Sequence, residues 1–567
     1  MTTHARPLAE WLAALSDEQL SDLFRARDVR ADAAWHDFFD AAEALLEPSA
    51  IARALPALTD TEARALISAR DGRGSRDRAA DLRAFALLRP DNTPWPEVTA
   101  ALSDRDAPPP ATEAPPHPSD ERASAHAAER AFTTVATVAD LLLLARDRPF
   151  ALLTGGTVSA AEKRQLADAG IPADAVDPLL AIATDAGLAV ADDRRLRTTA
   201  DAEPWLRAAV VDRWGVLAQG FRGALPRGVR TSEGGWRPPA AWPDAHPWDV
   251  AWHERSTALI ERARLLGLIA DDGTEPEWAA VLRRGEVPRP SSLAALLPPE
   301  VDRIFLQNDL SAIAPGPLAP ALDVRLRTLA GRESAAQASS YRFTPESIAR
   351  ALVLGETEQS ILDFLGEISL TGIPQPLQYL IGQTAQRHGL VRVSADPATG
   401  RTRIESADGT LIDAMSVDQA LRPLGLRRDD DALTTKVGSD TAYWALVEAR
   451  YPATLVDEHG TPLTSDRHPA ATPSPRPSTD YTALIASLRS HQGPDADAAW
   501  LDRELEAAVR TRALLRVSVG MPDGSTRELL LEATGLGGGR LRGRDRAADV
   551  ERTLPVSSIR AASIVEQ

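Results

Sequence analysis

The chain has 567 residues and a formal net charge of −18, from 81 acidic and 63 basic side chains. This acidic balance opposes broad, non-specific coating of nucleic acid, because phosphate binding depends on Lys and Arg displacing counterions, but it permits one local basic surface. The absence of cysteine excludes disulfides and thiolate metal sites.

Alanine and leucine supply most of the apolar content, and aromatic residues make up only 5%. The composition therefore favours a helix-rich protein, and the length predicts several domains. With the strand candidates described below, we expect a mainly α, multi-domain chain of the α+β class. The N-terminus shows no apolar signal-peptide core, and the longest strongly apolar run, around residues 141–144, is too short to span a bilayer. We expect a cytoplasmic protein without membrane contact.

The first 300 residues contain mostly helical patterns. Apolar stripes such as Leu8, Trp11, Leu12 and Leu15 predict a helical N-terminal domain at 1–105. A linker follows at 106–122, where a run of prolines enforces extended backbone. Residues 123–300 read as winged-helix modules, clearly at 176–206, where a helix precedes a hairpin, and more faintly at 259–270.

Residues 341–393 carry three helix patterns with explicit start and stop signals. Thr344 is placed to cap the first helix, with Pro345 in its first turn, and Thr357 is placed to cap the second. Prolines open the third helix, which ends near Gly389, and alternation at 390–393 predicts a strand.

This order, together with the strand and turn expected at 301–318, resembles the non-catalytic N-terminal region of XPB-type DNA helicases. It is also similar to actinobacterial helicase-associated proteins that contain an XPB N-terminal domain. The resemblance is most specific over 301–393, and we assign 301–427 to this α/β module. It implies engagement of DNA and association with a separate XPB-type helicase in trans, and it implies no ATP hydrolysis in this region.

An ordinary helicase motor is also opposed by the residues themselves. A P-loop needs a glycine-rich turn that ends in Gly-Lys-Ser/Thr, since the lysine must reach the β- and γ-phosphates. The chain contains only two lysines, Lys163 and Lys436, and neither follows a glycine. We therefore expect a protein that is not an enzyme.

The last third begins with a loop-rich region at 428–478, which ends in a second proline-rich linker. Residues 479–567 then show helices followed by four strand candidates, with an Asp-Gly turn at 522–525. This order resembles the small SH3-like β-barrel of WYL domains, and the family-like ending lies at 552–559. The Trp-Tyr-Leu tripeptide that names that family is absent, and residues 539–542 stand in its place.

Two groups of arginines are candidates for nucleic-acid binding. Because side chains in a strand alternate between faces, a spacing of two predicts that a row near the C-terminus points to one side. That row consists of Arg540, Arg542, Arg544 and Arg546. The second group, Arg194, Arg195 and Arg197, lies on the expected wing beside Asp192 and Asp193. Pairing of either group with nearby acids, such as Asp545 and Asp549, is the alternative.

No motif indicates catalysis, a metal site or a cofactor. The sequence has no His-Glu-x-x-His and no Gly-x-Ser-x-Gly, and His388 is interpreted as a helix cap or surface group. The favoured function is a non-catalytic DNA-binding or helicase-associated accessory protein in DNA repair. A WYL-type winged-helix transcriptional regulator and a protein–protein scaffold for an XPB-type helicase are the alternatives.

Overall fold

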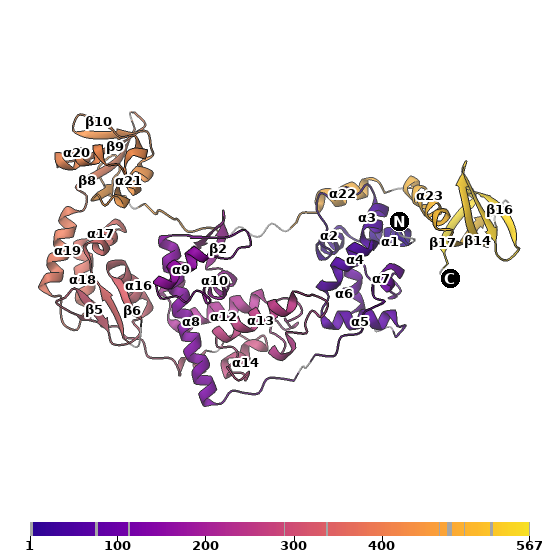
Figure 1. Ribbon diagram of the computed structural model, residues 1–567, viewed down its shortest axis with the longest axis horizontal. Coiled ribbons are helices and arrows are strands. Elements are labelled where there is room, and N and C mark those ends of the chain that lie inside the picture. The colour runs from indigo at the N-terminus through magenta and orange to yellow at the C-terminus, as the bar shows by residue number, and fades with distance from the viewer. Residues whose placement is uncertain are drawn as a thin grey trace.

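The computed structural model describes residues 4–73, 78–111, 114–288, 290–335, 338–397, 399–463, 465–472, 479–492, 494–521 and 525–565. It confirms a mixed, multi-domain α+β chain, predominantly helical, with several small sheets. The molecule is elongated, with a helical body at its centre. The region that resembles XPB-type helicases lies at one end and is here called the helicase-like end. Both chain termini lie at the other end (Figure 1).

The N-terminal domain is helical, as expected. Apolar faces of its helices meet in one core that contains Leu8, Phe24, Phe38 and Trp95. Capping boxes begin two of the helices, at Ser16 and at Thr59. The domain comprises α1 (Ala5–Ala14), α2 (Asp17–Ala26), α3 (Phe38–Leu46), α4 (Pro48–Ala54), α5 (Asp60–Arg70), α6 (Ala79–Ala84) and α7 (Pro96–Ala101).

Two helices from the far end of the chain complete this domain. The side chains of α22 (Thr482–Ser490) and Trp500 of α23 (Pro494–Thr511) enter the N-terminal core. The expected unit at 479–567 is therefore divided, because Leu501, Leu505 and Ala508 of α23 pack instead against the C-terminal sheet. Helix α23 joins the two ends of the chain.

The central body surrounds the 27-residue helix α8 (Glu121–Asp147). One apolar core unites it with a three-stranded antiparallel sheet in the order β1-β3-β2. The strands are β1 (Phe150–Ala151), β2 (Ala189–Asp192) and β3 (Arg195–Thr198). The other helices are α9 (Ala160–Asp168), α10 (Val176–Asp185), α11 (Ala202–Arg207), α12 (Val210–Ala224), α13 (Trp252–Leu265), α14 (Glu277–Arg283) and α15 (Ser291–Ala294).

The hairpin after α10 forms as predicted, but the second, fainter module at 259–270 does not. Helix α13 ends as expected, yet Leu268 and Ile269 belong to no strand and are buried in the central core. The turn at 271–273 leads instead to Glu275, which makes an isolated bridge with Pro118. The expected wing hairpin is therefore replaced by a turn whose two apolar residues pack into the central core.

The helicase-like end consists of two modules with separate cores. The first has a four-stranded antiparallel sheet, β4-β5-β7-β6, with Thr344 and Thr357 capping two of its helices as predicted. Its strands are β4 (Phe305–Leu306), β5 (Ser311–Ala314), β6 (Gly331–Ala335) and β7 (Ser339–Arg342). Its helices are α16 (Pro320–Leu329), α17 (Pro345–Val353), α18 (Glu358–Ile368) and α19 (Gln375–Arg387).

The second module crosses the expected boundary at 427/428. Its five-stranded sheet, β10-β11-β9-β8-β12, takes strands from both sides of that position. The strands are β8 (Val391–Asp396), β9 (Arg401–Ser406), β10 (Arg427–Asp429), β11 (Ala432–Thr435) and β12 (Ala453–Leu455). Helices α20 (Gly409–Val417) and α21 (Ser439–Glu448) complete it, so much of the segment expected to be loop-rich is ordered into one core.

The C-terminal sheet has the order β16-β15-β14-β13-β17. All four predicted strands form, and a fifth follows them. They are β13 (Leu514–Gly520), β14 (Thr526–Gly537), β15 (Arg540–Asp545), β16 (Val550–Pro555) and β17 (Ile559–Ile564). Within residues 525–565, β16 does not pair with β17, so the expected barrel is not closed. The Asp-Gly turn at 522–525 lies mostly outside the described residues.

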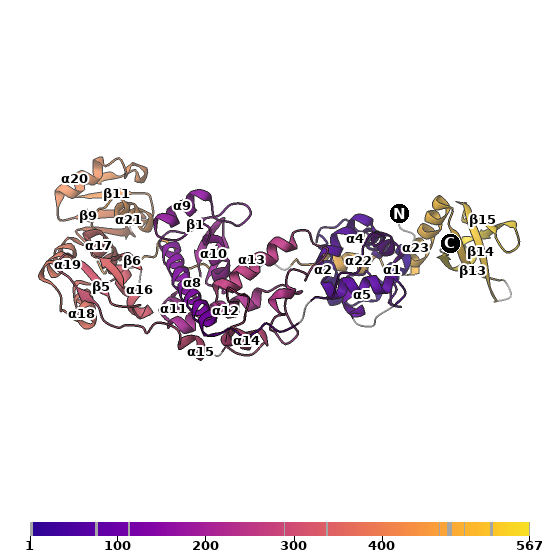
Figure 2. The same ribbon diagram turned by 60° about the horizontal axis from the view of Figure 1, so that its bottom comes forward.

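Figure 2 shows the helicase-like modules and the C-terminal sheet at opposite ends of the molecule, with the central body and the N-terminal domain between them. Residues 465–472, which follow β12, lie beside the central body near β2 (Figure 1). No helix within the described ranges is both long and apolar enough to cross a membrane.

Glu504 makes the junction between the chain ends sensitive to pH. It is 5% exposed on α23, with Arg6 Nη1 at 3.4 Å from its carboxylate, and burial raises its pKa to about 7. When a carboxyl has a higher pKa in the folded than in the unfolded chain, the folded protein loses stability as the pH rises from about 4.5 to 7. Glu504→Gln should therefore stabilise the protein at pH 8, by on the order of 3 kcal/mol at most, and change little at pH 4.5.

Thermal and urea unfolding at the two pH values will check this expectation. Glu10→Gln is the control, because Glu10 also contacts Arg6, at 2.9 Å, but is exposed. Parallel pH dependence of the wild type and Glu504→Gln would contradict a buried, titrating Glu504.

Candidate nucleic-acid interface

The predicted arginine row lies on β15, and three of its members share one exposed face. Arg540, Arg542 and Arg544 are exposed, while the residues between them are buried. Arg546 lies just after the end of the strand, where its backbone N–H donates to Leu530. The spacing of two therefore placed the side chains correctly within the strand.

Acidic partners divide this row into two pairs. Arg544 lies 2.7 Å from Asp549, and Arg546 lies 3.7 Å from Glu532. Arg540 and Arg542 have no acidic side chain within ion-pair distance among the described residues, since Asp545 is bound by Arg552 at 2.6 Å instead. Half of the row thus retains uncompensated charge.

The neighbours of Arg540 and Arg542 leave their face of the sheet open. In the β-ladder, Arg540 lies opposite Gly537 on β14 and Pro555 on β16. Arg542 lies opposite Gly535 and Thr553 in the same way. Cross-strand neighbours normally provide the closest side-chain contacts in a sheet, and none of these four carries a charge.

The wing arginines are engaged by the protein itself. Arg194 lies in the turn, with a φ of 58°, rather than on the strand. Arg197 on β3 binds Asp192 at 2.8 Å, and its guanidinium also donates to the carbonyl oxygen of Pro469 at 2.6 Å. Arg195 is exposed beside them.

The chain between β12 and α22 is here called the connector. It contains Pro469, and it adds backbone contacts to the wing. The N–H of Ala471 donates to the carbonyl oxygen of Thr198 at 2.8 Å, and Ala471 forms a parallel bridge with Thr199. This part of the wing is therefore already covered by the connector.

Helix α10, which precedes the hairpin, is also covered. Five of its ten residues are buried, among them Val176, Leu179 and Ile182. Asp185 near its end is bound by Arg262 of α13 at 2.6 Å. A Cβ at Gly220 of α12 would lie 2.4 Å from the Cα of Ala186, so α12 approaches this helix too closely for any larger residue. In this conformation α10 offers no broad face to a DNA groove.

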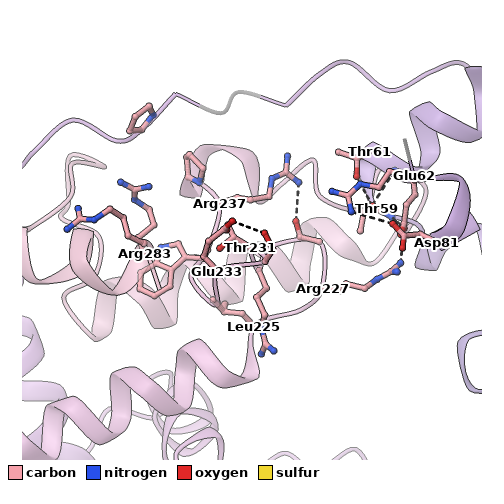
Figure 3. Close-up of a pocket in the computed structure, with 18 residues that line it drawn as sticks. Thr59, Thr61, Glu62, Asp81, Leu225, Arg227, Thr231, Glu233, Arg237 and Arg283 are labelled. Atoms are coloured by element: carbon pink, nitrogen blue, oxygen red, sulfur yellow. Dashed lines mark hydrogen bonds and ion pairs between the residues drawn. The ribbon is translucent and has the colours of Figure 1, made fainter. Parts of the chain in front are cut away.

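A first cavity, of about 930 Å³, lies between the N-terminal domain and the central body (Figure 3). Two arginines of the central body meet acids of the N-terminal domain here: Arg227 lies 2.7 Å from Glu62, and Arg237 lies 2.8 Å from Asp60, which is 1% exposed. Arg283 lies 2.7 Å from Glu275. The pairs of Arg227 and Arg237 join the two domains, whereas the pair of Arg283 lies within the central body.

A second, larger cavity, about 1400 Å³, lies at the helicase-like end and is here called the interdomain cleft. Helices α17 and α19 form one wall, and residues 450–453, which lead into β12, form another together with Trp444. The central body contributes Arg146 and Arg207, and the connector contributes residues 465–468. Three parts of the chain therefore meet here.

Three arginines of the cleft were not identified as candidates from the sequence. Arg350, Arg387 and Arg450 are exposed and, in the part of the chain that the structure describes, have no acidic partner. They are separated by 37 and 63 residues. No spacing rule connects them, because the packing of two modules brings them to one cavity.

His388 closes α19 as its C-cap residue, in agreement with the interpretation as a cap. Its Nε2 lies 3.2 Å from the hydroxyl of Thr454, and burial lowers its pKa. The neutral imidazole therefore predominates at neutral pH, and His388 adds no charge to the cleft that it lines.

The helicase-like end coincides with the region of known similarity. Residues 304–430 match the family described as helicase conserved C-terminal domain. The chain is also 32% identical over 95 residues to the DNA 3'-5' helicase XPB of Mycobacterium tuberculosis, a match that covers 17% of each protein. This chain is helicase-related. The expected XPB relationship is supported, whereas the matched family carries a C-terminal rather than an N-terminal description.

The division of the β15 row gives a test with a built-in control. The variant Arg540→Gln/Arg542→Gln should weaken DNA binding and flatten the salt dependence by about two units, because each phosphate contact contributes about 0.9. The variant Arg544→Gln/Arg546→Gln has the same net charge but alters arginines that already have acidic partners, so it should change binding less. Fluorescence anisotropy across a salt series measures both. If both variants bind DNA as the wild type does, the arginine row is a solvated face without a role in binding.

Proposed function

We propose that this chain is a non-catalytic, nucleic-acid-binding accessory protein that works beside a separate XPB-type helicase in DNA repair. The observation that carries the proposal is the helicase family match at 304–430, which coincides with modules bordering an arginine-lined cleft. Because the similarity to XPB spans only 17% of either chain, the activity of that helicase is not transferred.

The surroundings of the lysines favour a protein without its own motor. Lys163 on α9 lies 2.5 Å from Asp177, in an ion pair between two helices. Lys436 follows β11, which belongs to an antiparallel ladder with β9 and β10. Lys436 does lie between a strand and the helix α21, but two threonines precede it, whereas a P-loop lysine follows a glycine-rich turn.

Two further modules enter the proposal. The order α8, β1, α9, α10, β2 and β3 is that of a winged helix, and the helix α23 with the open sheet is similar to a WYL domain. A transcriptional regulator would read a groove with the helix before the wing. Since α10 is covered and the wing is occupied by the connector, these modules are better suited to holding the assembly together than to sequence readout.

The first test concerns nucleotide hydrolysis. Purified protein should not hydrolyse ATP, with or without duplex or single-stranded DNA, because neither lysine is placed to contact the phosphates. Phosphate release is the measurement, with an XPB-type helicase as the positive control. Hydrolysis that persists in a Lys163→Ala/Lys436→Ala variant would reveal an unconventional nucleotide site and overturn the proposal.

The second test concerns the partner. Phe305 and Leu370 are 39% and 55% exposed, and they are brought together where the Leu370 N–H donates to Ile304. The variant Phe305→Ser/Leu370→Ser should reduce co-purification with an XPB-type helicase if this face of the first module is the contact. Val250→Ser/Val417→Ser is the control, because it alters apolar residues outside that module that are even more exposed, at 99% and 76%. Equal retention by both variants would exclude this face.

A further inference from the structure

Arg387 and Arg450 are brought to the same edge of one sheet. Arg387 ends α19, four residues before β8, and Arg450 lies three residues before β12. Strands β8 and β12 pair in parallel, with Ala453 opposite Val391, so the segments before them enter the sheet side by side. The Val391 N–H donates to the carbonyl oxygen of Pro452 at 3.1 Å and fixes this arrangement.

Arg350 extends the group onto the neighbouring module. It lies in the last turn of α17, which packs against α19. Val353 of the same helix is partly buried against the core of the second module. All three arginines line the interdomain cleft, from two modules that touch at that point.

The three arginines differ from the other arginines of the cleft, which have acidic partners. Arg207 lies 2.7 Å from Glu203, and Arg325 lies 2.9 Å from Glu356. Arg467 also has a partner, Glu448. Only the group of Arg350, Arg387 and Arg450, within the described ranges, is left without an acid.

Neighbouring acids do not account for this group, and helix ends account for only two of its members. Among the acids of the cleft, Asp408 caps α20 by accepting from Thr410, and Asp466 accepts from the N–H of His468. Glu346 is exposed one turn before Arg350, but it is not within ion-pair distance. A cation in the last turn stabilises a helix by about 0.3–1 kcal/mol, which explains Arg350 and Arg387. Arg450 follows α21 in a turn with a φ of 64°, so it has no such role.

Aromatic side chains line the same cavity. Trp444 and Tyr451 are half-buried, and their polar edges are held by Ser465 at 3.2 Å and by Asp418 at 2.9 Å. The volume of about 1400 Å³ exceeds the range of roughly 300–1,000 Å³ that is typical of small-molecule sites. Unpaired arginines beside oriented rings are the combination that binds a single strand, through phosphate contacts and base stacking.

We infer that the interdomain cleft binds a single strand of nucleic acid, with Arg350, Arg387 and Arg450 contacting its phosphates and Trp444 or Tyr451 contacting a base. This inference rests on the proposed nucleic-acid function and names the site and the strand form that serve it.

The full-length protein and a fluorescent single-stranded oligothymidylate provide the test, with a hairpin duplex for comparison. The variant Arg350→Gln/Arg387→Gln/Arg450→Gln should bind the single strand at least about ten-fold more weakly at low salt. It should also flatten the salt dependence by about two units, at roughly 0.7 for each phosphate. The control Arg53→Gln/Arg122→Gln/Arg264→Gln removes three exposed arginines outside the cleft, with the same change in net charge, and should bind normally.

A 5-iodouracil oligonucleotide gives a second readout that a structural role would not move. On irradiation, it should cross-link to peptides that contain Trp444 or Tyr451 in the wild type, and much less in the triple cleft variant. Circular dichroism and thermal unfolding will establish that the variants are folded.

The outcomes separate the two proposals. If the wild type binds no nucleic acid at low salt, the proposed function fails together with this inference. If it binds but the cleft variant does so normally, or if cross-links map to β15 alone, the function stands and the cleft assignment is overturned. If the cleft variant instead loses binding of a polyglutamate peptide while retaining oligothymidylate, the cleft is a protein-docking site, and this inference is wrong.

Discussion

The arrangement of the whole chain depends on one buried cluster where α23 meets the N-terminal domain. Trp500 is 2% exposed and donates its indole N–H to Asp37 at 3.0 Å, while Arg503 binds Asp37 and Asp40. Asp37 also caps α3. A buried indole and a buried carboxylate each need a partner, so each makes the burial of the other favourable. This contact holds the C-terminal sheet beside the N-terminal helices.

The position of the connector follows from that contact. Because α22 and α23 dock at one end of the molecule and β12 lies at the other, the connector has to span the central body, and its residues 469–471 lie against the wing between these ends. On the way, the connector pairs with Thr198 and binds Arg197 through Pro469. The wing thereby becomes an attachment point for the chain itself. Positive charge remains available at the two ends of the molecule, on β15 and in the interdomain cleft.

The sequence predicted features that neighbouring residues determine. Thr344 and Thr357 cap helices as expected, and the alternation at Arg540, Arg542 and Arg544 describes a real strand face. Features set by distant residues were missed. The predicted boundary at 427/428 is wrong because β8 pairs with β12 across more than fifty residues. Helix α22 was assigned to the wrong unit because its core partners lie more than 370 residues earlier in the chain. The cleft arginines were missed for the same reason.

Pairing, rather than the number of arginines, distinguishes the basic surfaces of this acidic chain. The cavity of Figure 3 is rich in arginine, yet buried carboxylates such as Asp60 and Glu62 neutralise it, and separating such pairs would leave desolvated charges. An arginine without an acid keeps its full attraction for phosphate, and its electrostatic reach is about 8–10 Å at physiological salt. With a net charge of −18, the rest of the surface repels nucleic acid, so the proposed function confines binding to those few positions. Acidity of this kind favours local, oriented engagement of a strand over indiscriminate coating.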